Sequence, residues 1–265
     1  MIDNKIVLFD MDGTLTEPRG KFNTEFLILF REIIKYADIG ILTGADFSDV
    51  ENQLLRLIKF SEVRFKLHLL PCNGTKYYKP PRYPQEDFEI AYENDMQKEL
   101  GKSCLREIFK CVTQLQADSC YYDIPLSGHF VNYRGSMVNW CPIGRSADSV
   151  DRKAFIEYDK KSKFREKFLS NLQSKISLRC PNKVDIKLGG QTSFDIYPIG
   201  WDKTYALNHF EGYKHWFVGD ACHVGGNDHE IYELLKKENR AFHTKGPTDT
   251  QKIIYKKILP MLKHP

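Results

Sequence analysis

Two aspartates directly follow an apolar segment near the start of the chain. Residues 5–9 (KIVLF) are typical of a strand buried on both faces of a parallel sheet, and the segment DMDGT occupies residues 10–14. In an open α/β sheet, ligands bind outside the carboxyl ends of the strands. A turn at Gly13 can bring the carboxylates of Asp10 and Asp12 toward one such site. The alternative is a polar turn in which an aspartate only caps a helix.

Three further polar groups stand after apolar segments or turns. Thr43 follows the apolar run of residues 39–42, Lys203 follows Trp201, and Asp220 follows the run of residues 215–218. Taken alone, each has a simpler explanation: a turn hydroxyl, a solvated surface lysine and a helix cap. Their meaning depends on whether they form a series with Asp10 and Asp12.

The elements that would position these residues alternate at both ends of the chain. The expected order is strand, helix, strand and helix at residues 5–10, 24–35, 39–42 and from Ser48, then a strand and two helices at 215–220, 228–237 and 248–259. Ser48 with Glu51 fits a capping box, and Thr248 is the expected cap of the last helix. This alternation predicts a doubly wound α/β core with a parallel sheet.

The middle of the chain departs from this alternation. The segment PPRYP at residues 80–84 interrupts the pattern. Further on we expect two strands within 130–143, a helix over 163–176, and strands over 183–188 and 192–198. We therefore predict an inserted α+β cap domain at residues 83–198, and a core domain built from residues 1–82 and 199–265.

Composition narrows the function classes. The 265 residues include 39 Lys and Arg against 35 Asp and Glu, and 42% are hydrophobic, which fits a globular protein of one large or two modest domains. The basic residues are interleaved with acids, so no nucleic-acid partner is expected.

No membrane association is expected, because the apolar run at 26–30 is far shorter than the roughly 20 residues of a span, and residues 1–10 do not resemble a signal peptide. Seven cysteines without C-x-x-C spacing favour a reducing, cytoplasmic location and argue against zinc.

The segment DMDGT resembles the first motif of the haloacid dehalogenase superfamily. The resemblance implies that Asp10 attacks phosphorus to form an aspartyl-phosphate, and that Asp12 is the general acid and base. Because the nucleophile and the phosphate are both anionic, a divalent cation and a positive side chain must screen their repulsion. At the positions that match later motifs, Thr43 would hydrogen-bond the phosphoryl group and Lys203 would neutralise charge.

The fourth motif of this superfamily matches Asp220 and the segment GGND at residues 225–228. The resemblance implies a Mg²⁺ site, since Mg²⁺ prefers octahedral oxygen coordination. Asp10, the backbone carbonyl of Asp12, and Asp220 would be its protein ligands. Asn227 and Asp228 would be further ligands or partners of the ligands.

Other segments make the chain similar to the eukaryotic-type phosphomannomutase family over nearly its whole length. They are LTEPR (15–19), NG (73–74), the segment 134–146 ending in PIGRS, GGQTSFD (189–195), GWDK (200–203) and GGND (225–228). In this family the aspartyl-phosphate donates to a hexose monophosphate, and the resulting bisphosphate returns its other phosphate to the enzyme. The resemblance implies interconversion of mannose 6-phosphate and mannose 1-phosphate, activation by a hexose 1,6-bisphosphate, and a role in GDP-mannose biosynthesis.

The same resemblance assigns the cap to binding the hexose phosphate. Arg19 at the mouth of the core, and Arg134 and Arg145 in the cap, match phosphate-binding positions. Arginine suits this role because its planar fork binds phosphate bidentately. Ser193 and Asp195 match residues that contact phosphate and sugar hydroxyls. The family commonly pairs through its caps, which implies a homodimer.

Three segments depart from the family pattern. Ser127 stands where the family has an arginine seven residues before the position of Arg134; Thr43 and Ala45 stand where it has glycine and serine; and residues 221–224 (ACHV) differ from its usual loop. Two alternatives therefore stay open. One is a sugar-phosphate phosphatase on the same scaffold, in which water reaches the aspartyl-phosphate that a closing cap would otherwise protect. The other is a non-catalytic sugar-phosphate-binding module, against which the intact aspartate and lysine series argues.

Overall fold

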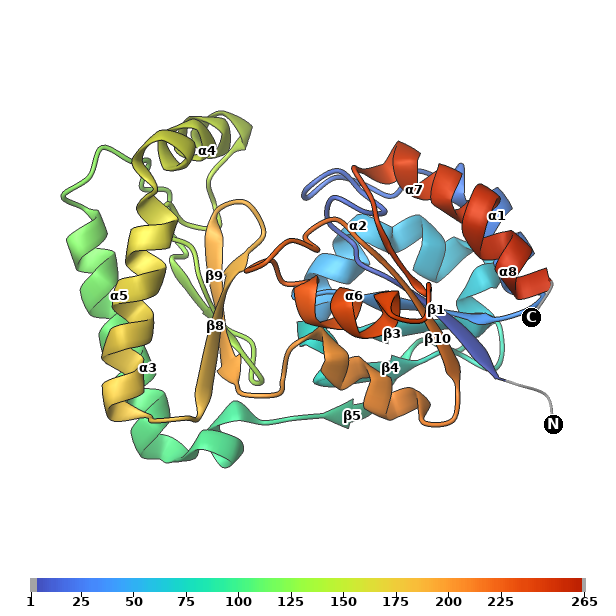
Figure 1. The fold of residues 1–265 in the computed structure, drawn as a ribbon, viewed down its shortest axis with the longest axis horizontal. Helices are drawn as coiled ribbons and strands as arrows, with labels where there is room; N and C mark the ends of the chain where they lie inside the picture. The colour runs from blue at the N-terminus through green and yellow to red at the C-terminus, as the bar shows by residue number, and fades with distance from the viewer. Residues whose placement is uncertain (1–3, 264–265) are drawn as a thin grey trace. The chain divides into compact units, whose positions relative to one another are not determined.

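The chain forms two compact units, which a computed structural model describes over residues 4–263 (Figure 1). The core unit runs to Glu93 and resumes at Trp201, and the cap unit spans Asn94–Gly200. Residues 1–3 and 264–265, which belong to the ends of the predicted core domain, lie outside the described residues. In the described part of the chain, no helix has both the length and the apolar character needed to cross a membrane.

The core unit is built on one sheet with the strand order β11-β10-β1-β2-β3-β4-β5. Its strands are β1 (Lys5–Phe9), β2 (Asp38–Leu42), β3 (Leu67–Leu70), β4 (Lys76–Lys79), β5 (Glu89–Glu93), β10 (Lys214–Gly219) and β11 (Ala241–His243). The neighbours from β11 to β3 pair in parallel, and β4 and β5 continue the sheet with antiparallel pairing. The predicted α/β class with a mainly parallel sheet is confirmed.

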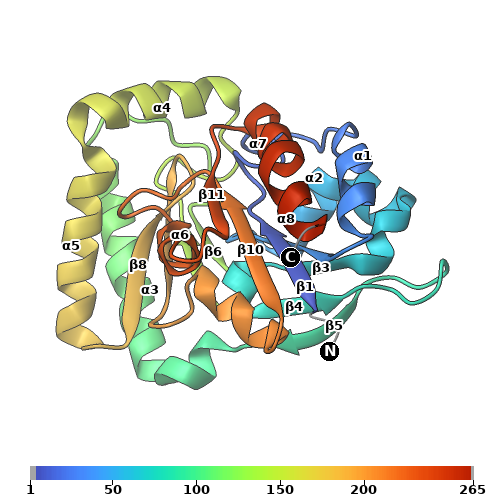
Figure 2. The ribbon, with the colours of Figure 1, turned by 45° about the vertical axis from the view of Figure 1, so that its right-hand side comes forward.

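Helices cover both faces of this sheet (Figure 2). They are α1 (Phe26–Ile33), α2 (Phe47–Phe60), η1 (Glu62–Lys66), η2 (Cys72–Gly74), η3 (Lys203–Phe210), α6 (His229–Lys236), α7 (Pro247–Ile253), η4 (Ile254–Ile258) and α8 (Leu259–Lys263). On β1, Val7 and Phe9 pack into the cluster with α1, α2 and the C-terminal helices, whereas Ile6 and Leu8 pack into the cluster with η3 and α6. This two-sided burial explains why the strand is apolar throughout, since each buried side chain of this size contributes about 1.5–3 kcal/mol.

The cap unit packs helices on one face of a four-stranded antiparallel sheet with the order β6-β7-β9-β8. Its elements are α3 (Met96–Ser119), β6 (Val131–Tyr133), β7 (Val138–Trp140), α4 (Ser149–Ser162), α5 (Phe164–Arg179), β8 (Val184–Gly189) and β9 (Ser193–Pro198). Figure 1 shows α3 and α5 side by side along the sheet. The predicted helix is confirmed, because α5 buries the four apolar residues that recur once per turn, which are Phe164, Phe168, Leu172 and Ile176.

The structure differs from the predicted domain boundary at residue 82. Residues 83–93 stay with the core unit, because β5 pairs with β4 and extends the core sheet. The five residues of β5 are all exposed, so this edge strand has no buried face, although Ile90 and Tyr92 alternate with smaller or charged residues. The segment PPRYP therefore belongs to the loop between two paired strands and does not separate domains.

Two predicted helix caps are wrong. Helix α2 begins at Phe47, and its N-cap is Asp46, whose extended backbone precedes the helix and whose side chain accepts the amide of Phe47. Ser48 already lies inside the helix, so it cannot form the expected capping box. The last helix begins at Pro247 after Gly246 instead of being capped by Thr248, because proline suits the first helical position.

A disulfide joins Cys104 of α3 to Cys180, the residue that follows α5, with their Cα atoms 5.6 Å apart. Both cysteines are buried. This bond differs from the expectation of reduced cysteines, which rested on the odd number of cysteines and their spacing. Two thiols that are 76 residues apart in the chain carry no local signal of pairing.

Candidate active site

Three adjacent parallel strands bring the predicted catalytic residues to one edge of the core sheet. Asp10 follows β1, Asp220 follows β10 and Thr43 follows β2. The amide of Asp10 donates to the carbonyl of Val218 at 2.9 Å, so the sheet pairing continues up to Asp10. Because parallel strands end at the same edge, the strand order itself gathers these side chains.

Lys203 lies between two aspartates at this edge. Its side chain is completely buried, and its Nζ is 2.5 Å from Asp10 Oδ1 and 2.5 Å from Asp228 Oδ1. The other oxygen of Asp228 accepts the amide of Ala221 at 3.0 Å. Asp228 thus holds the lysine beside Asp10, the predicted nucleophile.

Burial and mutual repulsion raise the pKa values of the carboxyl groups. Burial raises the pKa of Asp10 well above its usual range, against the lowering effect of Lys203. Burial and the Asp228 carboxylate likewise raise the pKa of Asp220 to about 6. For Lys203, burial alone would lower the pKa, but Asp10 and Asp228 raise it above its usual value. Lys203 therefore stays protonated, and its single positive charge does not balance the negative charges of the surrounding carboxylates.

The carboxylates of this cluster fit a divalent cation. Asp10, Asp220 and Asp228 each offer an oxygen, and these atoms lie within 4.8 Å of one another. Hard oxygen donors in this number suit Mg²⁺, and its charge would relieve the repulsion between these carboxylates. Asn227 directly precedes Asp228 and is half-buried. Its part in a metal site, and that of the Asp12 carbonyl, stay predictions.

Gly13 is required by the close approach of the aspartate loops. Its φ is +81°, and a Cβ at this position would collide with the carboxylate of Asp220. The glycine therefore lets the segment after β1 pass next to the segment after β10. This is the physical reason for the glycine in the DMDGT motif.

Asp12 sits in a compact loop above the nucleophile strand. Its Oδ1 accepts the amide of Arg19 at 2.6 Å, and the amides of residues 14–16 converge on the carbonyl of Met11. Arg19 has a φ of 59° and is exposed, so its backbone anchors Asp12 while its side chain lies at the surface. The structure thus places Arg19 next to the predicted acid and base.

Thr43 is buried, and both its backbone and its side chain are engaged in hydrogen bonds. Its hydroxyl accepts the amide of Ala45 at 3.1 Å, and its carbonyl accepts the amide of Asn73 at 2.9 Å.

A second buried lysine contacts the segment that follows Thr43. Asp46, three residues after Thr43, forms an ion pair with the buried Lys76 at 3.1 Å, and Lys76 also pairs with Glu93 at 3.3 Å. Lys76 is not among the residues that the motifs predict.

The cap unit brings a second group of polar residues together on the face of its sheet opposite to the helices. Asn139 of β7 lies opposite Asp195 of β9, and its Nδ2 donates to Asp195 Oδ1 at 2.7 Å. Arg145 donates to Asn139 Oδ1 at 3.4 Å. Sequence reasoning missed Asn139, although its place between the buried Val138 and Trp140 follows the alternation of a strand and could have revealed it.

The other predicted cap residues lie near this face or at its end. Ser193 is on β9, two residues before Asp195 and therefore on the same face. Arg134 is buried in the turn after β6, where its guanidinium donates to the sulfur of Met137 at 3.5 Å. Ser127, which stands in place of an arginine, donates to Asp151 of α4 at 2.8 Å.

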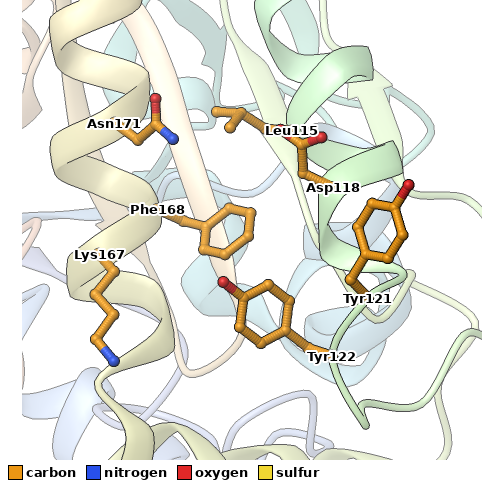
Figure 3. A pocket seen from close by; sticks show the side chains of 7 residues that line it. All are labelled: Leu115, Asp118, Tyr121, Tyr122, Lys167, Phe168 and Asn171. Atoms are coloured by element: carbon orange, nitrogen blue, oxygen red, sulfur yellow. The ribbon is translucent and has the colours of Figure 1, made fainter.

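A pocket of about 360 Å³ lies elsewhere in the cap unit, between α3 and α5 (Figure 3). It is lined by Leu115, Asp118, Tyr121, Tyr122, Lys167, Phe168 and Asn171. None of the predicted site residues is in this lining. The chemistry that the sequence predicts therefore does not belong to this pocket.

The chain is similar in sequence to known proteins. The family profile described as eukaryotic phosphomannomutase matches residues 24–260. The chain is 34% identical to a phosphomannomutase of Drosophila melanogaster over 95% of this chain and 94% of that one. It is 35% identical to a phosphomannomutase of Nicotiana benthamiana over 93% and 91%.

Solved structures share the fold at low sequence identity. An IMP-nucleotidase of Plasmodium falciparum matches 99% of this chain and 71% of its own, with a TM-score of 0.63 and 15% identity. A trehalose-6-phosphate phosphatase of Aspergillus fumigatus matches 99% and 94%, with a TM-score of 0.51 and 13% identity. At this identity these neighbours inform on the fold alone.

Proposed function

The chain belongs to the eukaryotic phosphomannomutase family, and from this premise we propose that it interconverts mannose 6-phosphate and mannose 1-phosphate by phosphoryl transfer through Asp10. The observation that carries the proposal is the buried ion pair between Asp10 and Lys203 at 2.5 Å. A carboxylate that is to attack a phosphate needs a fixed positive charge beside it, and Lys203 supplies one.

In the first step, a carboxylate oxygen of Asp10 attacks phosphorus of a hexose 1,6-bisphosphate. The new bond joins Asp10 to phosphorus, and the bond from phosphorus to the sugar oxygen breaks. Asp12 gives its proton to that leaving oxygen, so that a neutral hydroxyl departs. The products are the aspartyl-phosphate and a hexose monophosphate.

In the second step, a hydroxyl of a hexose monophosphate attacks the aspartyl-phosphate. Asp12 takes the hydroxyl proton, and the Asp10 carboxylate is the leaving group. Thr43, at the end of β2, would donate its hydroxyl to an oxygen of the transferring phosphoryl group. Lys203 stays paired with the Asp10 carboxylate before attack and after release, and so lowers the energy of the charge that develops.

Bound Mg²⁺ would supply further positive charge to stabilise the phosphoryl transfer. Asp10, Asp220 and the carbonyl of Asp12 would hold it, with Asn227 and Asp228 as additional ligands or as partners of the ligands. This role is supported by the oxygens of three aspartates gathered within 4.8 Å. Asp228 already binds Lys203 and the Ala221 amide, which favours its role as a partner.

Arg134 and Arg145, with Ser193 and Asp195, would bind the distal phosphate and the sugar hydroxyls, and Arg19 would approach the substrate from the core unit. The proposal is supported by the way Asn139 links Arg145 to Asp195 and so holds a cation and an acceptor on one sheet face. Two such charge-assisted contacts contribute about 1.5–3 kcal/mol each.

A sugar-phosphate phosphatase is the second candidate, and Ser127 is the observation that favours it. Its hydroxyl binds Asp151, so this position offers no cation to a phosphate. With one phosphate contact fewer, the hexose monophosphate leaves more easily, and water can then take its place at the aspartyl-phosphate. A non-catalytic binding module would not need the ion pair between Asp10 and Lys203.

A coupled assay with mannose 1-phosphate tests the proposal. We expect mannose 6-phosphate to form in Mg²⁺, faster when a hexose 1,6-bisphosphate is added, with little free phosphate. Free phosphate without isomer would assign the chain to the phosphatases. Neither product, combined with binding of mannose 1-phosphate, would leave a binding module. Sedimentation of the purified protein and cell fractionation test the accompanying proposals of a homodimer and a cytoplasmic location.

A further inference from the structure

Gln53 is a polar residue on the buried face of α2. Only 7% of its surface is exposed, and its neighbours on the helix, Val50, Leu54 and Leu57, belong to the apolar core cluster. A buried amide is destabilising unless its hydrogen-bonding groups are satisfied. The partners of Gln53 therefore indicate what this side chain does.

The side-chain amide of Gln53 faces the loop that carries Asp12. With Nε2 turned to this loop, its two hydrogens face three acceptors, which are Thr16 Oγ1 at 3.0 Å, the carbonyl of Gly20 at 3.1 Å and Asp12 Oδ1 at 3.3 Å. The opposite orientation would set the amide oxygen against the acceptors of Gly20 and Asp12, so the hydrogen-bond partners decide the assignment.

The main chain of Gln53 and the hydroxyl of Thr16 extend this contact. The carbonyl of Gln53 accepts the amide of Phe22 at 2.9 Å, and Thr16 donates to the carbonyl of Met11 at 3.2 Å. One residue of α2 thus connects the start, the middle and the end of the loop between β1 and α1. Helix α2, whose backbone is kinked at the following residue Leu54, in this way anchors a loop that forms no helix or strand.

Two donors converge on the same oxygen of Asp12. Oδ1 accepts the amide of Arg19 at 2.6 Å and Nε2 of Gln53 at 3.3 Å. With both bonds on Oδ1, the carboxyl plane is set and a proton exchanged with substrate would travel on Oδ2. Proton transfer depends steeply on such orientation, and a displacement of about 1 Å can reduce a rate by about 100-fold.

We propose that Gln53 is a positioning residue for Asp12, which orients the carboxyl group of the acid and base without touching substrate. The inference rests on the proposed function, because Asp12 needs orientation only if it transfers protons. Gln53 then affects the steps that move a proton and spares the step that does not. Phosphorylation of Asp10 by acetyl phosphate is such a step, since acetate leaves without a proton.

The test compares Gln53→Met with Asn52→Ala as the matched control. Asn52 directly precedes Gln53 on α2 and is exposed. Its Oδ1 accepts a hydrogen bond from Lys21 Nζ of the same loop at 2.5 Å, and it does not reach Asp12. For Gln53→Met we expect transfer from hexose 1,6-bisphosphate to slow by roughly 10- to 100-fold, and single-turnover labelling by acetyl phosphate to change less than about threefold. Asn52→Ala should leave both rates unchanged.

A double-mutant cycle with Asp12→Asn separates positioning from a general structural role. If Gln53 acts through Asp12, adding Gln53→Met to Asp12→Asn should cause no further loss of transfer from the bisphosphate. Additive losses would overturn the inference, as would equal losses in both reactions of the single variant. Gln53→Asn, which keeps the amide one methylene shorter, should fold with a thermal midpoint near that of the wild type and show a smaller, equally selective loss.

The labelling of the wild type tests the proposed function, and the rates of the variants test the role of Gln53. A wild-type protein that acetyl phosphate does not label at Asp10 would contradict the proposed function itself, whatever Gln53 does. A wild type that is labelled, with variants that lose neither reaction selectively, would overturn only the role of Gln53. Failure of both Gln53 variants to fold would make the residue structural and would also overturn its proposed role.

Discussion

The two groups of predicted site residues differ in how their charges are held. In the core unit, Lys203 is completely buried and lies 2.5 Å from two carboxylates, with no neutral group between them. In the cap unit, the neutral amide of Asn139 stands between Arg145 and Asp195, and Arg145 is only half-buried. Buried charges in direct contact respond strongly when the charge of one partner changes, as it does during a reaction. In contrast, Arg145 and Asp195, which are joined only through the neutral amide of Asn139, can exchange that amide for a ligand.

Strand geometry explains this difference. Asp10 and Asp220 directly follow parallel strands, and Lys203 and Asp228 reach the same point from the starts of η3 and α6. Asn139, Ser193 and Asp195 stand within antiparallel strands, where side chains spread over a face. A point of convergence suits a reacting atom, and a face suits the recognition of a sugar and its distal phosphate.

Asp10→Asn should produce the largest effect, because it removes the proposed nucleophile from the core group. We expect turnover to fall by about 10⁴-fold or more with the fold retained, and no label from acetyl phosphate. Isomer formation measured in the coupled assay, and the far-UV circular dichroism spectrum, check both parts. Appreciable turnover by this variant would remove the basis of the comparison.

Lys203→Met should reduce both activity and stability. It leaves two buried carboxylates without their cation, which destabilises the fold by about 3–5 kcal/mol when a buried pair loses one partner. Urea unfolding in excess chelator measures this loss, and Lys76→Met, which also removes a buried lysine from the core unit, is the control for stability. Wild-type stability of Lys203→Met would mean that the carboxylates are neutral and the ion pair unimportant.

Metal removal should change stability in a pH-dependent way through Asp220. Because its pKa is raised to about 6 in the folded protein, the unfolded chain loses this proton first, and metal-free stability should fall as the pH rises from about 4 to 6. Mg²⁺ should therefore raise the thermal midpoint more at pH 7 than at pH 5, with about 2.7 kcal/mol of stabilisation at 100 times its Kd.

The matched variant for this experiment is Asp220→Asn, which should lose the part of the metal-free decline that comes from Asp220, with the part from Asp10 remaining, and most of the Mg²⁺ response. Thermal melts of both proteins, with chelator and with Mg²⁺, give the comparison. A response of the same size in the wild type and the variant would show that Mg²⁺ acts elsewhere.

Arg145→Ala should have a smaller effect that is confined to binding. Losing one charge-assisted hydrogen bond of about 1.5–3 kcal/mol should raise the KM for hexose phosphates by roughly 10- to 100-fold, with the thermal midpoint nearly unchanged because the side chain is half-buried. Steady-state kinetics with mono- and bisphosphates measure it. Unchanged KM values for both would mean that the cap does not bind phosphate through Arg145.

Ser127→Arg should have the smallest effect in the otherwise unchanged chain. Asp151, which now accepts the Ser127 hydroxyl at 2.8 Å, would pair with the new arginine and hold it away from phosphate. Combined with Asp151→Asn, the arginine should lower KM by about threefold to tenfold and reduce the free phosphate released per isomerisation. An equal gain without the second substitution would show that Asp151 does not restrain this position.

Local sequence determined those parts of the fold whose physical causes are local. The apolar run before Asp10, the glycine of the motif and the four apolar residues of α5 each specify an element by periodicity or backbone freedom. Asp10, Lys203, Asp220 and Asp228 were also predicted from the motif series, and the structure brings them together. In contrast, β5 buries none of its residues, and α2 is capped by Asp46 rather than Ser48, because Asp46 has the extended backbone that precedes the helix.

Only the tertiary structure decided which charged residues form ion pairs and which polar side chains hydrogen-bond the site residues. Asp228 binds Lys203 across 25 residues, Asn139 reaches Asp195 across 56, and Gln53 reaches Asp12 from another element. None of these pairs has a characteristic spacing, because each depends on strand order and on the face from which a helix packs. The sequence by itself determined which groups can react, and the fold decided their protonation and orientation, because burial and long-range contacts set both.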